Sequence, residues 1–251
     1  MTEGTDYDVV VVGGGVAGLS AGTFTARHGL DTAVLSAGGS LLRRNAHLEN
    51  YPGFPAGVDA RLLLDMMAAQ AERHGCELYE AEVTRLVRVD RGTGSGFTVE
   101  TASGSEWSTE YVVAATKNAT GYLEGLDGIE FLHRGKTFVV TDGAGRTGVP
   151  GLYAAGRLAE KPHQAVVAAG HGAEVAVTLL EDDDRPFYHD WVAPEGYFTG
   201  RGREVPPGCE EIDEAEHRRR EHESMTVMRE YFAEPHPETP EQHPSVEADE
   251  D

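Results

Sequence analysis

The chain has 251 residues, and its formal net charge of −22 reflects 43 acidic against 21 Lys and Arg side chains. A surface this acidic repels phosphate groups, which argues against nucleic acids and anionic membranes as partners. Only three of the basic residues are lysines. Acidic, lysine-poor composition is typical of proteins from salt-loving microbes, where molar salt screens like-charge repulsion. We favour this halophilic interpretation over an ordinary acidic fold that carries an acidic tail.

The two cysteines, Cys76 and Cys209, lie far apart in the sequence and form no CxxC motif. This usage fits a reducing compartment. The first eight residues are polar and acidic, unlike a secretory signal. The apolar run over residues 9–12 is far too short to span a bilayer. We therefore expect a cytoplasmic protein without a membrane segment.

The N-terminal segment predicts a strand, a glycine-rich turn and a helix. A β-branched run over residues 9–12 enters Gly13-Gly14-Gly15, a small-residue helix is expected over residues 16–28, and a second parallel strand over 32–35. Gly13, Gly15 and Gly18 fit the G-x-G-x-x-G spacing in the strand–turn–helix context that this motif requires. The segment therefore predicts a site for the ADP half of a dinucleotide.

Each position of this motif has a physical role. Gly13 permits the tight turn, Gly15 lets the backbone approach a pyrophosphate, and Gly18 allows close helix–strand packing. The free N–H groups at the helix start, where Val16 and Ala17 stand, carry partial positive charge. An acid that would hold a ribose hydroxyl is missing, because Ser36 stands at the end of the second strand.

The rest of the chain predicts an α/β fold, in which a parallel sheet carries a small antiparallel β-meander. The expected helices cover residues 59–74 and 164–180, and the expected strands cover 78–89, 97–101, 107–111, 112–116, 138–141 and 152–155. We predict a nucleotide-binding domain over 1–182, an aromatic and charged extension with one helix (212–232) over 183–232, and an acidic disordered tail over 233–251. Aromatic residues within 186–211 are expected to cover the exposed inner face of the domain or a second subunit.

Four segments together resemble the low-molecular-mass thioredoxin reductases. In chain order they are Val11–Gly18, the Asn50-Tyr51-Pro52-Gly53-Phe54 stretch that follows Glu49, Val112–Thr116, and Thr147–Gly156 with Gln164-Ala165 after it. The resemblance covers roughly residues 6–182. It implies a three-layer FAD/NAD(P)-binding Rossmann-like domain. The NADPH domain that the family inserts is missing, because the stretch between Thr116 and Thr147 is too short to fold as one and holds no CxxC.

The resemblance and the glycine motif together imply a set of FAD-binding residues. The flavin ring is expected near Asn50, Thr116 and Gln164. The full predicted set is Gly13, Gly15, Val16, Ala17, Gly18, Ser36, Gly39, Ser40, Asn50, Val83, Thr116, Gly156, Arg157, Gln164 and Ala165. No catalytic residue is assigned.

Three positions depart from the family pattern. Lys117 replaces the glycine of an Ala-Thr-Gly segment, Ser40 replaces the glutamine of Gly-Gly-Gln, and Arg157 replaces the aspartate that contacts the ribityl chain. Arginine cannot accept a hydrogen bond from a ribityl hydroxyl, although it could pair with a phosphate. Arg43-Arg44 could bind an anionic partner or the pyrophosphate, or simply be solvated.

Other chemistry is less favoured. The eleven histidines show no metal-ligand spacing, so surface or capping roles are expected for them, including His171, and no metal is predicted. Cys209 is interpreted as structural or incidental, with a redox role over the flavin as the alternative.

The leading hypothesis is an FAD-dependent oxidoreductase that lacks an NADPH domain and a redox disulfide. Its electrons would come from free NAD(P)H or a separate donor protein, and we expect a homodimer. A non-catalytic dinucleotide-binding or interaction protein of the same fold is the alternative, favoured by Lys117 and Arg157. A thiazole-synthase type of enzyme ranks lower, because it would not explain the segment over residues 50–54.

Overall fold

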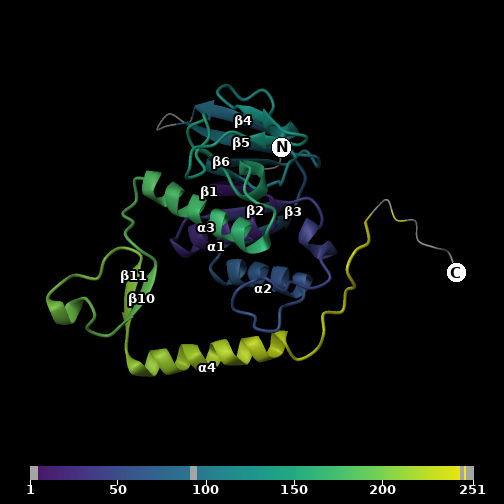
Figure 1. Ribbon diagram of the computed structural model, residues 1–251. Coiled ribbons are helices and arrows are strands. Elements are labelled where there is room, and N and C mark those ends of the chain that lie inside the picture. The colour runs from purple at the N-terminus through teal and green to yellow at the C-terminus, as the bar shows by residue number, and fades with distance from the viewer. Residues whose placement is uncertain (1–4, 91–94, 244–245, 247–251) are drawn as a thin grey trace. The chain divides into compact units, whose positions relative to one another are not determined.

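The computed structural model describes residues 5–90, 95–243 and 246, and the chain divides into two compact units (Figure 1). The larger unit comprises Met1–Leu179 together with Glu238–Asp251, and the smaller one comprises Leu180–Pro237. The domain boundary expected after residue 182 and the limits of the tail stay predictions.

A parallel sheet forms the centre of the larger unit. Its strands are β1 (Thr5–Val12), β2 (Thr32–Ser36), β3 (Glu77–Glu80), β6 (Glu106–Ala114) and β9 (Leu152–Ala154). They lie in the order β3-β2-β1-β6, and β9 pairs with the end of β6. The strand–helix–strand unit that the glycine motif requires is therefore present, since β1 and β2 pair in parallel from Val9↔Thr32 to Val12↔Leu35.

An antiparallel meander continues from the other half of β6. The strands β4 (Val83–Asp90) and β5 (Ser95–Thr101) pair with each other, and β5 pairs with residues 106–109 of β6. The predicted strands 107–111 and 112–116 are therefore one strand, which pairs with β1, with β5 through its first half and with β9 through its second half. A small separate ribbon pairs β7 (Phe131–His133) with β8 (Thr137–Val139).

One predicted strand is wrong. The segment over residues 78–89 forms two strands, because β3 ends at Glu80 beside Ser36 and the chain then turns into the meander at Val83. The loose alternation of polar and apolar residues in this segment cannot reveal the change of direction, which depends on which strands accept the two halves.

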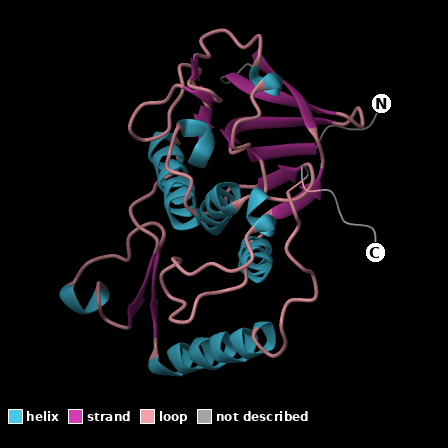
Figure 2. Cartoon of the chain, turned by 45° about the vertical axis from the view of Figure 1, so that its right-hand side comes forward, coloured by secondary structure: helices cyan, strands magenta, loops and turns pink. Residues whose placement is uncertain are grey.

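Helices cover the opposite face of the sheet from the meander (Figure 2). They are α1 (Val16–Arg27), α2 (Ala60–Arg73) and α3 (Ala165–Asp182). Asp59 begins α2 by accepting hydrogen bonds from the N–H groups of Arg61 and Leu62, at 2.8 and 3.1 Å. Short 3₁₀ turns η1 (Leu41–Arg44), η2 (Gly121–Leu123) and η3 (Gly156–Ala159) complete the unit.

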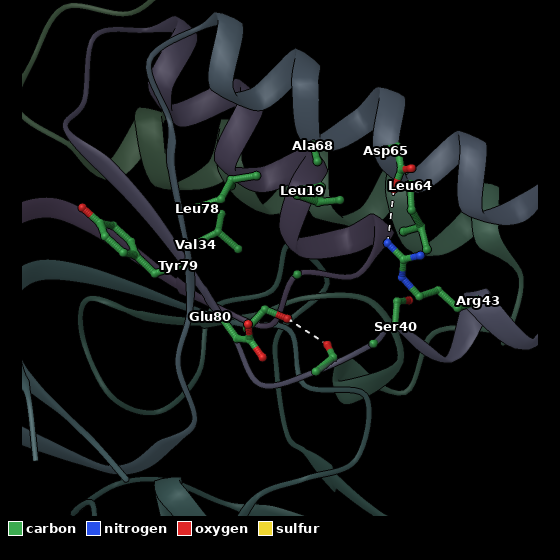
Figure 3. Close-up of a pocket in the computed structure, with 14 residues that line it drawn as sticks. Leu19, Val34, Ser40, Arg43, Leu64, Asp65, Ala68, Leu78, Tyr79 and Glu80 are labelled. Carbon is green, nitrogen blue, oxygen red and sulfur yellow. Dashed lines mark hydrogen bonds and ion pairs between the residues drawn. The ribbon is translucent and has the colours of Figure 1, made fainter. Parts of the chain in front are cut away.

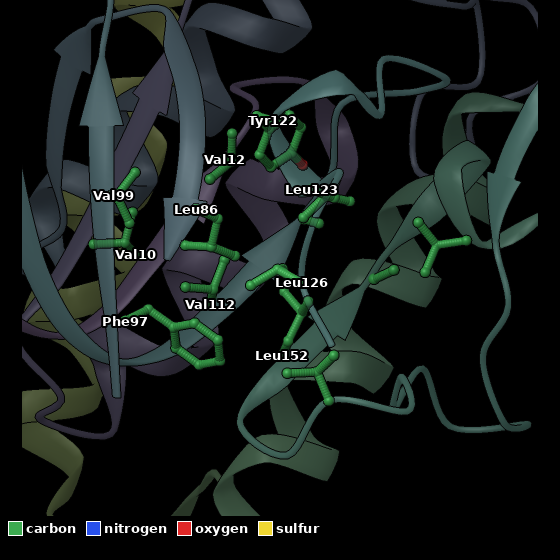
Figure 4. Packing of buried hydrophobic residues seen from close by; sticks show 14 of the residues in the cluster. Val10, Val12, Leu86, Phe97, Val99, Val112, Tyr122, Leu123, Leu126 and Leu152 are labelled. Atoms are coloured by element: carbon green, nitrogen blue, oxygen red, sulfur yellow. The ribbon is translucent and has the colours of Figure 1, made fainter. Parts of the chain in front are cut away.

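The core lies in two layers around the sheet, which explains the uninterrupted apolar run of β1. Val10 and Val12 face the meander, where Leu86, Phe97 and Val99 bury them (Figure 4). On the helical side, Leu19 of α1 and Leu64 of α2 share a second cluster with Leu78. Residues 9–12 are all buried because both faces of the sheet are covered. The predicted three-layer α/β fold is confirmed.

The smaller unit contains its own elements. Parallel strands β10 (Trp191–Pro194) and β11 (Cys209–Ile212) are joined through the 3₁₀ turn η4 (Thr199–Arg201), and α4 (Glu214–Tyr231) follows. Trp191 lies edge-on to Tyr197 and Phe198, with ring centroids 4.5 and 5.9 Å away. The aromatic residues that sequence reasoning assigned to a covering role therefore contact one another; their packing on the domain or on a second subunit stays a prediction.

The acidic tail is only partly described. Residues 244–245 and 247–251 of the predicted disordered segment lie outside the described residues. Over residues 233–243 no helix or strand forms, yet Glu238 and Glu241 make ion pairs with Arg43 and Arg44, at 2.7 and 3.7 Å. None of the helices in the described part of the chain has the length and apolar character that crossing a bilayer requires.

Candidate functional site

Several of the predicted site residues lie at one edge of the parallel sheet. The glycine loop follows β1, Ser36 ends β2, Thr116 lies two residues beyond β6, and Gly156 lies two beyond β9. The carboxyl ends of parallel strands meet at the same edge, and ligands of open α/β sheets bind in the crevice outside that edge. The topology thus brings together segments that are more than a hundred residues apart.

The glycine loop is held by contacts that exclude larger side chains at two of its three motif positions. Gly13 has φ +116°, and a Cβ atom there would lie 2.6 Å from the carbonyl oxygen of Ala115. A Cβ atom on Gly18 would lie 1.8 Å from the carbonyl oxygen of Gly13. At Gly15, by contrast, a Cβ atom would meet only the Ser40 hydroxyl at an ordinary 3.5 Å. Gly15 therefore borders open space.

The start of α1 is arranged to attract an anion. Gly15 is its N-cap and has no side chain to accept the first N–H groups, and the first turn contains no acidic residue. The N–H groups of Val16, Ala17 and Gly18 have no acceptor within the helix, and together with the helix dipole they favour a negatively charged group. A pyrophosphate fits this position, so the residues present suit the ADP part of FAD.

A pocket of about 370 Å³ opens beside the loop (Figure 3). Its walls are apolar towards the helices and polar at the strand ends. The lining residues are Gly14, Leu19, Val34, Ser36, Gly38, Gly39, Ser40, Arg43, Leu64, Asp65, Ala68, Leu78, Tyr79 and Glu80. This pocket adjoins the loop on the side where the adenosine of a dinucleotide would lie.

Three predicted residues line this pocket. The Ser36 hydroxyl donates to the carbonyl oxygen of Gly38 at 3.3 Å, and Ser40 caps η1 by accepting from the Leu42 N–H at 3.3 Å. Gly39 lies between them. Val83 is not among the lining residues; it packs against the core cluster on the meander side. Sequence reasoning missed Glu80 because it placed that residue inside a longer strand.

Asn50 and Gln164, predicted near the flavin ring, come together across 114 positions of sequence. The Asn50 amide Nδ2 donates to Gln164 Oε1 at 2.8 Å, next to Ala165 at the start of α3. The Thr116 hydroxyl donates to the carbonyl oxygen of Ala119 at 2.6 Å and lies 3.1 Å from the Tyr122 hydroxyl. The fold thus brings Asn50 and Gln164 into contact, while Thr116 is held by its own loop after β6.

Lys117 has a backbone conformation that favours glycine. Its φ is +64°, in the left-handed region that costs a residue with a side chain about 1 kcal/mol or more. The loop after β6 therefore holds a strained residue. Nothing else in the structure explains the lysine at this position.

Arg157 is engaged by protein groups. Its guanidinium lies over the Phe138 ring, 5.0 Å from the ring centroid, and Nη1 donates to the carbonyl oxygen of Lys161 at 3.3 Å. An arginine here offers donors only, so it cannot replace the acceptor that the family places against the ribityl chain. The ADP end of the site fits FAD as expected, and the ribityl position departs from the pattern.

His171 corrects an expectation from the sequence. It is buried within α3, at 3% exposure, instead of lying at the surface or capping a helix. Its Nδ1 accepts the Gly156 N–H at 2.9 Å, so the ring proton is on Nε2, which has no hydrogen-bond partner among the described residues. Burial, together with the nearby charge of Lys161, lowers the pKa of His171 to about 4. The imidazole is therefore neutral and orients the backbone of Gly156.

The two cysteines lie in different environments. Burial raises the pKa of the Cys76 thiol to about 12, which makes it a poor nucleophile. Cys209 lies on β11 in the smaller unit, where its thiol contacts the carbonyl oxygen of His189 at 3.6 Å. Among the residues that the structure describes, no group of three or more His, Cys, Asp and Glu side chains is placed to hold a metal ion.

Comparison with known proteins agrees with this geometry. Residues 8–48, which contain the second half of β1, the glycine loop, α1 and β2, match the FAD binding domain family. The thioredoxin reductase of Treponema pallidum (strain Nichols) is 36% identical over 141 residues, covering 55% of this chain and 44% of that protein. That of Streptomyces clavuligerus is 38% identical over 113 residues, covering 43% of this chain and 34% of that protein.

A solved thioredoxin reductase from Gloeobacter violaceus superposes with a TM-score of 0.65 at 20% identity, covering 74% of this chain and all of that one. The fold is that of thioredoxin reductases. The predicted resemblance is thereby confirmed, and the family match over residues 8–48 supports FAD as the cofactor. In sequence, however, the alignments span less than half the length of these curated relatives, so their activity does not transfer directly.

Proposed function

We propose that this protein is an FAD-dependent oxidoreductase whose flavin exchanges electrons with partners outside the chain. The observation that carries the proposal is the glycine loop, which places the uncapped start of α1 and the open face of Gly15 beside a pocket of about 370 Å³. When bound, FAD supplies the electron transfer, while the protein orients it and adjusts its electrostatic surroundings.

The chain's own groups would act at two places. The first-turn N–H groups of α1 would bind the pyrophosphate. At the other end, the joined amides of Asn50 and Gln164 and the hydroxyl of Thr116 offer fixed hydrogen-bonding groups for the polar edge of a ring. The neutral His171 supports this end from beneath by holding the Gly156 N–H.

The electron donor and the assembly belong to the proposal as well. We infer that electrons arrive from free NAD(P)H or from a separate donor protein, since the stretch after Thr116 is too short for a nucleotide domain. We further propose that the protein forms a homodimer. The free cysteines support a cytoplasmic location, and the net charge of −22 supports work at high salt.

The test is flavin binding by the purified full-length chain in high salt, together with two matched variants. In Gly15→Ala the added methyl group would lie 3.5 Å from the Ser40 hydroxyl, an ordinary contact, so the protein should fold. The same methyl group would obstruct the pyrophosphate. We expect FAD affinity to fall at least tenfold. Gly170→Ala, in α3 with no heavy atom within 4 Å of the added carbon, should leave it unchanged.

Reduction separates catalysis from binding. Anaerobic addition of NADH or NADPH, or of a chemical reductant as a control, should bleach the flavin absorbance if the flavin is functional. A chain that stays colourless and takes up no added FAD would disprove the proposal.

A non-catalytic dinucleotide-binding protein is the second candidate, and Arg157 favours it. With its guanidinium over Phe138, Arg157 provides no acceptor for a ribityl hydroxyl. This candidate predicts that ADP and FAD bind with similar affinity, because the flavin half would contribute nothing, whereas a flavoenzyme should bind FAD much more tightly than ADP. Isothermal titration with both ligands decides between them.

A further inference from the structure

We propose that Glu80, at the carboxyl end of β3, supplies the carboxylate that binds the ribose hydroxyls of the adenosine. In folds with this glycine motif the acid ordinarily ends the second strand, where this chain has Ser36. The inference rests on the proposed binding of FAD and names the residue that selects its ribose.

The register of the sheet places Glu80 next to the missing acid. Ser36 and Glu80 are Cα partners in the parallel pair of β2 and β3, and the following Ala81 N–H donates to the Ser36 carbonyl oxygen at 3.0 Å. Neighbouring strands lie about 4.8 Å apart. A glutamate side chain is long enough to cover much of that spacing, so its carboxylate can serve the position that Ser36 leaves without charge.

The side chain also lies on the required face. Two residues earlier, the partners Val34 and Leu78 form the apolar wall of the pocket beneath α1 and α2. Side chains two apart on a strand share a face, so Ser36 and Glu80 continue that wall beyond the helices. A Cβ atom on Gly14 would lie 2.9 Å from the Ser36 hydroxyl, which places this pair beside the glycine loop.

Figure 3 shows the same arrangement. Glu80 lies below Val34 and Leu78, at the end of the pocket away from Asp65. The side chain belongs to the pocket lining together with Ser36 and Gly38.

Of the two carboxylates that line the pocket, only Glu80 is available. Asp65 is 3.2 Å from Arg43 Nη2, so a cation already compensates its charge. Glu80 is exposed, and its side chain makes no hydrogen bond or ion pair with another residue of the described part of the chain. A carboxylate accepts charge-assisted hydrogen bonds from two neighbouring hydroxyls, which are stronger than those a serine can make.

The same charge should discriminate between nucleotides. A 2′-phosphate would bring negative charge against Glu80, and like charges at this separation repel. We therefore expect the pocket to bind adenosine nucleotides with free ribose hydroxyls and to reject those with a 2′-phosphate.

The test is isothermal titration of the full chain with ADP, 2′-deoxy-ADP and adenosine 2′,5′-bisphosphate. Glu80→Gln keeps the shape and removes the charge. Glu82→Gln is the matched control, since Glu82 is exposed and lies outside the pocket lining. We expect the unmodified chain to prefer ADP over 2′-deoxy-ADP by about tenfold. Glu80→Gln should lose most of that preference and weaken ADP binding about tenfold, and it should bind the bisphosphate more tightly than the unmodified chain does.

The outcomes are distinct. If the unmodified chain binds FAD and ADP but Glu80→Gln behaves like Glu82→Gln, the role of Glu80 is disproved while FAD binding stands. If the unmodified chain binds neither FAD nor ADP, both the proposed function and this inference fail. Far-ultraviolet circular dichroism confirms that each variant is folded, which an exposed Glu→Gln change should leave intact.

Discussion

The two ends of the candidate dinucleotide site are built differently. The adenosine end consists of strand termini and a glycine loop in which added Cβ atoms would meet backbone, as at Gly13 and Gly18. The flavin end consists of loops after β6 and β9, where Lys117 has positive φ and Arg157 lies over Phe138. The first end has the features that an ADP group needs, while the second departs at these two positions from the expected family pattern. Substitutions at the two ends can therefore affect ligand binding and turnover separately.

The largest effect is expected at the adenosine end. Gly18→Val would place its Cβ atom 1.8 Å from the carbonyl oxygen of Gly13, so the loop and α1 cannot keep their positions. We expect a loss of stability of at least about 3 kcal/mol or failure to fold, measured by urea unfolding followed by circular dichroism. Gly170→Val, the same change on an exposed turn of α3, should cost less than about 1 kcal/mol. Equal stability of the two variants would contradict this view of the loop.

The next effect concerns the buried imidazole beneath the flavin end. The pKa of His171 is about 4 in the folded protein, lowered from an ordinary value near 6.5. As the pH falls, the unfolded chain therefore takes up a proton on this imidazole before the folded protein does, which favours unfolding. The contribution of this neutral imidazole to stability is complete above pH 6.5 and is lost as the pH falls towards 4, by about 3 kcal/mol. His171→Asn, which keeps an acceptor for the Gly156 N–H, should lack this loss.

The free energy of unfolding of the unmodified protein is measured against that of His171→Asn at each pH, because the carboxylates of the acidic surface also titrate. The carboxyl pKa values of Asp59 and Asp142 are lowered by hydrogen bonds from backbone N–H groups and from neighbouring arginines, so their contributions are lost at lower pH than that of His171. Identical pH profiles between pH 6.5 and 4 would contradict a neutral, buried His171.

A smaller gain is expected from relieving the strain after β6. Lys117→Gly restores the residue type that tolerates φ +64°, at the cost of a more flexible unfolded chain. We expect stability to rise by about 0.5–1 kcal/mol. Lys136→Gly, at an exposed lysine without positive φ, should be neutral or slightly destabilising. If Lys117→Gly destabilises the protein, the lysine makes a contribution that outweighs its strain.

The smallest effect is expected from the tail. Glu238 pairs with Arg43 at 2.7 Å, and Arg43 lines the adenosine pocket. Exposed ion pairs contribute little to stability, so Glu238→Gln should change the free energy of unfolding by less than about 0.5 kcal/mol. Arg43 keeps its ion pair with Asp65 but loses that with Glu238, so at low salt its positive charge should improve ADP affinity about twofold, and the gain should vanish at high salt. Tighter binding that persists in molar salt would contradict an electrostatic cause.

Much of the fold follows from short-range patterns. The glycine spacing, the apolar run of β1 and the helix periodicity identify β1, α1 and α2, because turns and periodicity depend on neighbours in sequence. The helix limits are right to within one residue, whereas β1 begins four residues before the predicted strand. The strand over residues 78–89 was predicted wrongly, since its two halves pair with different strands. The same error hid Glu80.

The sequence by itself determined that a strand, a glycine loop and a helix form the unit predicted to bind the ADP part of a dinucleotide, because the residues of the motif are close neighbours in sequence. Only the tertiary structure decided that Glu80 stands beside Ser36, that Asn50 bonds Gln164 and that His171 is buried against Gly156. These contacts depend on strand register and on the packing of α3, which are set by the burial of apolar surface over the whole domain.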